Sequence, residues 1–428
     1  MTDRIAQLGM RLVNGEVRFY RNRQISAIRQ ALRLIFPIIL LGSLADFLEQ
    51  SWLRTDGYYY QTLHVARWLF QVKILRQYLR LISAGTLGLA GILMAFAVSF
   101  YLVVPVTQHM TDRLMAGTIA VISLKFFNVT RTSVLGGHTI KWVATDLGIQ
   151  GILVGILVGV LVGNGYRWAL GHRSPDLEQI PSTLVITCTW LVVMAALGLL
   201  WVSTQTVSLN SAFASIIRWP FRLPHFILGL LGYCVLNGAF EWLGVLGPLS
   251  ASSGQSIESA QNLAAVLAHH GWQLPHPLTL HTVVSVYANV GGTGMMLALL
   301  LALFLSRPTA WQRRIGWLSL VPTLGNVNAP MMVGLPVILS PLMGIPFILA
   351  PSACITLSWL CIRLKWVPAV AYPLLTGTPG PLQAYLGTGG NWTALALSLA
   401  DLILSTAIYY PFVKLVQAAH RQLDGEVA

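Results

Sequence analysis

Long apolar stretches separated by short polar or basic ones cover most of this chain. In the first half they lie at roughly residues 34–48, 81–106, 114–127, 147–162 and 184–207. A helix needs about 20 apolar residues to cross about 30 Å of hydrocarbon, and each stretch comes near that length, 114–127 and 147–162 only marginally. The pattern predicts an all-α polytopic membrane protein, with further spanning helices in the second half at 226–246 and 392–412.

A basic, roughly amphipathic segment at residues 15–33 precedes the first apolar stretch. Apolar side chains recur around it at helical spacing, at Ile25, Ile28, Leu32 and Ile35. We expect this segment to lie along the cytoplasmic interface before residues 34–48 enter the bilayer. Its arginines then form a solvated face.

The second half is organised around residues 325–351, an apolar stretch that carries five prolines and the two asparagines Asn326 and Asn328. Proline breaks the helical hydrogen-bond ladder, and non-helical backbone in a membrane must be buried in protein or line a wet cavity. We therefore predict that residues 326–330 are the non-helical tip of a re-entrant hairpin that faces a cavity. The alternative is a pair of proline-kinked spanning helices whose asparagines cap helix ends.

Polar groups within the neighbouring apolar stretches favour a site at this tip. Asn237 and Glu241 are four residues apart and share a helix face. Gly291 and Gly292 permit a close backbone approach in the stretch 281–305, and we expect them to lie near the tip. A polar interruption at 250–277 separates these stretches and is expected to contain a short helix at 256–269.

Carboxyl groups inside spanning helices are candidates for function. Glu241 is either a site residue or a structural acid paired with an arginine or with broken backbone. For Asp46 and Asp401 we favour structural pairing.

Glycines at positions 151, 155, 159 and 163 leave one helix face nearly bare. That face is either a packing or dimer surface, or it packs within its own subunit.

Cysteine and histidine spacing indicates no metal site and no cofactor. Cys188, Cys234, Cys354 and Cys361 lie in apolar stretches and are expected to be buried thiols. The histidines, of which four cluster at 269–281, show no zinc-binding motif and are interpreted as solvent-facing or capping residues.

Composition agrees with a membrane protein. The 428 residues are 55% hydrophobic and 10% charged, against about 25% charged in soluble domains. The net charge of +13 comes from arginines grouped at the ends of apolar stretches, which fits the positive-inside rule better than nucleic-acid binding. No removable signal peptide is evident, and both termini are expected in the cytoplasm. We divide the chain into halves 1–205 and 206–428, with a seam at 206–225.

The chain resembles the membrane subunit IIC, the permease component of the bacterial sugar phosphotransferase system, lactose/cellobiose (diacetylchitobiose) type. An AIR sequence followed by proline and Gly-Ser within residues 23–44 matches the family's opening. Ordered matches in the second half are YANVGGTG (287–294), NVNAPMMVGLP (326–336), TPGP (378–381) with GTGG (387–390), and YYPF (409–412).

This resemblance implies a permease of the bacterial inner membrane with about ten spanning helices and two re-entrant hairpins. It implies a homodimer formed through the first five helices and an oligosaccharide bound in the second half. Soluble IIB, loaded through IIA, would phosphorylate the sugar. The residues assigned to the sugar site are Asn237, Glu241, Asn289, Gly291, Gly292, Asn326 and Asn328.

Two departures from the family pattern bear on the chemistry. Ala329 stands where the family's motif has a glutamate, which can act as a general base towards the sugar hydroxyl. The upstream histidine of the family is also absent. We therefore expect a sugar-binding permease for oligosaccharides or β-glucosides with impaired phosphorylation, at most the membrane component of a phosphotransferase, with Glu241 as a candidate substitute base. The alternatives are an EIIC-like sensor domain of a larger signalling protein and a facilitator that does not modify its sugar.

Overall fold

The computed structural model describes residues 2–131, 140–172, 179–204, 215–217, 219–222, 226–245, 257–268, 274–335 and 337–425. These ranges are helical, with turns and two isolated bridges in place of strands. Seven of their helices are long and apolar enough to cross a membrane. The prediction of an all-α polytopic membrane protein is confirmed. The predicted boundary between residues 205 and 206 lies outside the described residues.

The first half contains α1 (Thr2–Arg21), α2 (Arg23–Leu48), η1 (Glu49–Leu53), α3 (Tyr58–Thr62), η2 (Val65–Arg67), α4 (Val72–Thr86), η3 (Leu87–Leu89), α5 (Ala90–Val103), α6 (Met110–Phe127), α8 (Ala144–Leu147), η4 (Ile149–Gly151), α9 (Ile152–Gly171) and α10 (Gln179–Thr204). The second half contains η5 (Trp219–Arg222), α12 (Phe226–Leu243), α13 (Ile257–Leu267), η7 (His281–Ser285), α14 (Met296–Leu305), α15 (Ala310–Leu324), α16 (Ala329–Gly334), α17 (Pro341–Arg363), α18 (Gly380–Gly387) and α19 (Trp392–Gly425).

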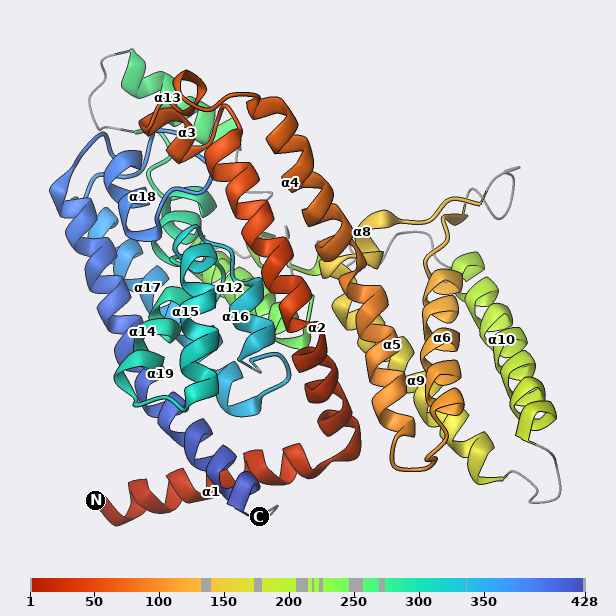
Figure 1. The fold of residues 1–428 in the computed structure, drawn as a ribbon. Coiled ribbons are helices and arrows are strands. Elements are labelled where there is room, and N and C mark those ends of the chain that lie inside the picture. The colour runs from red at the N-terminus through yellow and green to blue at the C-terminus, as the bar shows by residue number, and fades with distance from the viewer. Residues whose placement is uncertain are drawn as a thin grey trace.

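The amphipathic lead-in is α1, which ends earlier than expected. The predicted lead-in of 15–33 is wrong in its boundary, because Asn22 caps a new helix with its side chain and α2 already begins at Arg23. Val13 and Val17 of α1 pack on Ala419 of α19, so the two chain ends meet. Figure 1 shows α1 lying across one end of the molecule, with both termini at that end.

Helices α5, α6, α9 and α10 form a bundle to one side of the other helices (Figure 1). A Cβ added at Gly155 would lie 2.4 Å from the carbonyl oxygen of Gly91, and one at Gly159 would lie 2.8 Å from that of Ala95. Both contacts are with α5 of the same chain. The glycine face therefore packs within the subunit, and the dimer-surface interpretation of this face is wrong.

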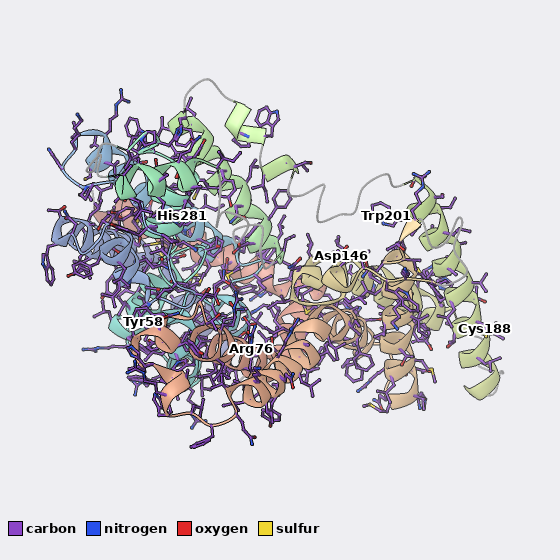
Figure 2. The ribbon with its side chains drawn as sticks, turned by 90° about the horizontal axis from the view of Figure 1, so that it is seen from above. Tyr58, Arg76, Asp146, Cys188, Trp201 and His281 are labelled. Atoms are coloured by element: carbon purple, nitrogen blue, oxygen red, sulfur yellow. The ribbon has the colours of Figure 1, made fainter. Side chains whose placement is uncertain are left out.

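Helix α10 lies at the edge of this bundle, and many of its large apolar side chains are exposed. Figure 2 shows Cys188 and Trp201 on α10 far from His281 in the other part of the molecule. Cys188 is exposed, whereas Cys234, Cys354 and Cys361 are buried. The prediction of a buried thiol is wrong for Cys188, because an apolar stretch can face lipid as well as protein.

The remaining helices form the larger body, in which α2 packs on α16 of the second half and α19 packs on α17 and α14. A single cluster of buried side chains runs from α2 and α5 through α12, α14, α16, α17 and α19. The first half thus contributes α2 to the surroundings of the second-half hairpin. Helix α19 continues through Pro411, well beyond the predicted end at residue 412.

Candidate functional site

The stretch 325–351 is broken twice. Helix α15 ends at Leu324, residues 325–328 are non-helical, and α16 runs only from Ala329 to Gly334 before a second break that ends at Ser340. Asn326 adopts the left-handed conformation (φ 64°), which asparagine tolerates better than most residues. The predicted break in the helix is confirmed at Asn326–Asn328; that this tip is re-entrant and faces a cavity stays a prediction, since other residues line the pocket described below. Its extension to Ala329 and Pro330 is wrong, because proline fits the first turn of a helix and the two residues open α16.

A backbone break in another segment, at residues 291–294, lies against this tip and is called the glycine break. Between η7 and α14, Gly291, Gly292 and Gly294 have φ values of 85°, 92° and 80°, which are strained for residues with a Cβ. A Cβ on Gly292 would lie 2.7 Å from the Cβ of Asn328. The expected proximity of the glycines and the tip is confirmed.

The Asn326 side chain joins three segments. Its Oδ1 accepts a hydrogen bond from the Gly291 amide at 2.8 Å, and its Nδ2 donates to the Thr378 carbonyl at 3.0 Å. The segment around Thr378 approaches closely because Gly380 has no side chain, and a Cβ there would lie 3.2 Å from Asn326 Oδ1. Both ends of the Asn326 amide are thus used inside the protein.

Glu241 lies beside the tip and is buried. Its Oε2 accepts from Asn328 Nδ2 at 3.1 Å and its Oε1 from Asn237 Nδ2 at 3.4 Å. The Thr293 hydroxyl, next to the glycine break, is a further hydrogen-bonding partner. The partners of this carboxyl group are therefore side-chain amides and a hydroxyl; a structural acid was expected to pair with an arginine or with broken backbone.

A pocket adjoins this cluster. Polar lining comes from Asn237, Ser285, Asn289 and Thr293, and apolar lining comes mainly from α12, η7 and α17. Its free volume of about 20 Å³ is the size of a site for a water molecule.

Sequence reasoning missed several residues at this place. Phe347 of α17 covers Gly294, and Tyr233 and Cys234 of α12 line the pocket. Cys234 and Tyr233 lie three and four residues before Asn237 on the same helix, so helical spacing from Asn237 could have found them. Thr293 was part of the quoted glycine segment but was not singled out, since a threonine among glycines gives no signal for a binding role.

Other candidates from the sequence have structural surroundings. Asp46 accepts hydrogen bonds from Gln50 at 2.7 Å and Ser83 at 3.4 Å. The backbone and ring of His276 bond to Asn262 and Gln261, while residues 269 and 270 lie outside the described residues. Within the described ranges no group of three or more metal-ligating side chains occurs.

Comparisons with known proteins assign the chain to a family. The family described as "Phosphotransferase system, EIIC" matches residues 29–351. The cellobiose-specific EIIC component of Geobacillus stearothermophilus is 26% identical, over 95% of this chain and 93% of that protein. The lichenan permease IIC component of Bacillus subtilis (strain 168) is 23% identical, over 92% and 89%.

A solved structure is also similar. It is the transporter ChbC, the IIC component of the N,N'-diacetylchitobiose-specific phosphotransferase system, with 21% identity, coverage of 95% of this chain and 97% of that one, and a TM-score of 0.42. The family match begins within α2, includes both backbone breaks and ends near the middle of α17. The chain therefore belongs to the EIIC family, the membrane permease components of the phosphotransferase system.

Proposed function

We propose that this chain binds an oligosaccharide of the β-glucoside class and carries it across the bacterial inner membrane as a permease component. The observation that carries the proposal is the cluster of Glu241, Asn237, Asn328 and Thr293 between two backbone breaks. Relatives named for cellobiose and lichenan support this sugar class.

The cluster offers the hydrogen-bonding groups that a sugar needs. Carboxylate and amide oxygens accept bonds from sugar hydroxyls, and amide N–H groups donate to them. Asn289, Asn237 and Thr293 already line the pocket. We assign a positioning role to Asn326, Gly291 and Gly292, since they hold the hairpin tip against the glycine break.

Phosphorylation is expected to be slow in this chain. Ala329 occupies the motif position of the base and has no group that can take the proton of the attacking hydroxyl. Glu241 is the neighbouring carboxyl group, but both of its oxygens accept bonds from asparagine amides. We therefore assign Glu241 to orienting the sugar, and we expect IIB, loaded through IIA, to phosphorylate it weakly.

A phosphotransfer assay in membrane vesicles with cognate IIA and IIB and with cellobiose tests this proposal. Ala329→Glu is expected to raise the rate by about 10²–10⁴-fold, the usual contribution of a general base. Ala329→Gln is the matched control, because it adds a side chain of the same size without a proton acceptor. A rate in the native chain that Ala329→Glu does not raise, and that Glu241→Gln abolishes, would show that Glu241 is the base.

The topology that fits this function places both termini in the cytoplasm. Support comes from the basic helix α1, which lies at the same end of the molecule as the C-terminus (Figure 1). We further propose that the protein is a homodimer formed through the half 1–205. With the glycine face of α9 filled by α5, the outward surface of α10 becomes the candidate contact.

A further inference from the structure

Asp401 is a buried acid outside the proposed sugar site. It is fully buried within the spanning part of α19, at Trp392–Leu423. An acid at such a position is expensive for a membrane protein and is rare unless it serves a function or has a partner. Its surroundings therefore bear on what it does.

The hydrogen bonding of Asp401 is incomplete. The Ser358 hydroxyl donates to Oδ2 at 2.7 Å, whereas Oδ1 is buried and has no partner. The Tyr287 hydroxyl and the Ser398 hydroxyl are likewise buried without a hydrogen bond. Tyr287 is close enough to Asp401 for the two groups to interact electrostatically.

No cation faces this carboxyl group from the described elements packed on α19. Helix α17 places Cys354 and Cys361 near it, and the segment before the glycine break places Tyr287 there. On α19 itself Ser405, about one turn beyond Asp401, is bonded to Cys354, and Tyr409 lies about two turns beyond Asp401. Helix α14 (MLALLLALFL) has no titratable side chain, α18 has only Tyr385, which packs on Trp392, and α1 meets α19 near Ala419, far along the helix.

We propose that Asp401 binds a proton and that this proton is linked to sugar binding, an inference that rests on the proposed function. The proton passes from a hydronium ion to Oδ1, leaving water and a neutral carboxylic acid. Protonation thereby removes a negative charge that only one donor compensates in the apolar interior. Structural pairing, as expected from the sequence, would have given both oxygens a donor, as Asp46 has.

Asp401 is connected to the pocket through the segment of Tyr287, with which it interacts electrostatically, and through its own helix α19. The segment of Tyr287 supplies the pocket residues Ser285, Ala288 and Asn289. Helix α19 also holds the glycine break directly, because the Tyr409 hydroxyl donates to the Gly294 carbonyl at 2.5 Å. The charge state of Asp401 and the arrangement of the break are thereby coupled, and coupling between two sites acts equally in both directions.

The proton site is tested first without sugar. Infrared spectra of the purified protein at neutral pH are expected to contain a carbonyl band of a protonated carboxylic acid that disappears in Asp401→Asn and stays in Asp46→Asn. Asp401→Glu, which keeps an acid, is expected to retain a shifted band and serves as a second variant if the asparagine variant does not fold. Absence of any band sensitive to residue 401 would overturn the proposal.

The link to sugar is tested by cellobiose binding at several pH values. In the native chain and in Asp46→Asn, the dissociation constant is expected to change about fivefold or more between the two charge states, the usual lower range of coupling between sites. In Asp401→Asn the pH dependence is expected to fall while binding remains, and what is left comes from Glu241 in the sugar cluster itself. The same pH dependence in Asp401→Asn would overturn the link. Failure of the native chain to bind cellobiose would contradict the proposed function instead, with the infrared result still deciding the proton site.

Discussion

Gly292→Ala tests the contact between the two backbone breaks. The φ of Gly292 is 92°, and left-handed backbone costs an L-residue about 1–2 kcal/mol. The new methyl group would also lie 2.7 Å from Asn328 Cβ and 3.0 Å from the Asn326 carbonyl oxygen. Asn328 must then move, and its hydrogen bond to Glu241 is lost.

Two separate effects are expected from this substitution. Backbone strain lowers the free energy of unfolding by about 1–2 kcal/mol. If the Asn328 bond also orients Glu241 for the sugar, its loss weakens binding by about 1.5–3 kcal/mol, as for other hydrogen bonds to a charged group. That corresponds to roughly 10- to 150-fold in the dissociation constant for cellobiose.

The assay combines thermal unfolding in detergent with cellobiose binding. Gly85→Ala is the matched control, because Gly85 lies within α4 and a Cβ there has no atom within 4 Å. It is expected to raise stability slightly, since alanine is the better helix former. If Gly292→Ala binds cellobiose and unfolds as the native chain does, the contact between the two breaks does not determine the arrangement of the site.

Three further predictions concern the frame around the site. Asn326→Ala removes both bonds of the tip and is expected to lower the free energy of unfolding by about 1–3 kcal/mol, whereas Asn14→Ala, at an exposed position of α1, is expected to leave it nearly unchanged. Glu16→Gln weakens the cap of α17 and is expected to lower the unfolding temperature, whereas the exposed Glu258→Gln does not. Oxidation in native membranes is expected to cross-link Cys188 between subunits; cross-links from second-half positions alone would contradict dimerisation through α10.

The backbone breaks could be predicted because their causes are local. Proline cannot continue a helix, and the asparagines and glycines tolerate the conformations that replace it. The shared face of Asn237 and Glu241 also follows from a spacing of four. These features need no knowledge of which segments meet.

What could not be predicted depends on neighbours distant in the sequence. Hydropathy does not separate a lipid-facing side chain from a protein-facing one, so Cys188 and the glycine face of α9 were ambiguous. Asn326 holds the tip against another segment through its bond to Thr378, which is 52 residues away. Structural pairing of Asp401 was the expectation, and only the position of Ser358 shows that a single oxygen is paired.

The base of the hairpin, at Ser340 and Leu342, is hydrogen-bonded to helix α1. Buried Glu16 of α1 accepts bonds from the Ser340 hydroxyl at 2.6 Å and the Leu342 amide at 3.0 Å, which caps the start of α17.

Trp242 of α12 donates to the Ser340 carbonyl at 2.8 Å and follows directly after Glu241. A chain of contacts thus joins α1 to Glu241. Glu16 is bonded to Ser340, Ser340 is bonded to Trp242, and Trp242 follows Glu241 in the sequence. If the proposed disaccharide enters the pocket of about 20 Å³, elements around the pocket must move. A movement that displaced Ser340 would break its bonds to Glu16 and Trp242, so these bonds oppose any shift of the hairpin base relative to α1 and α12.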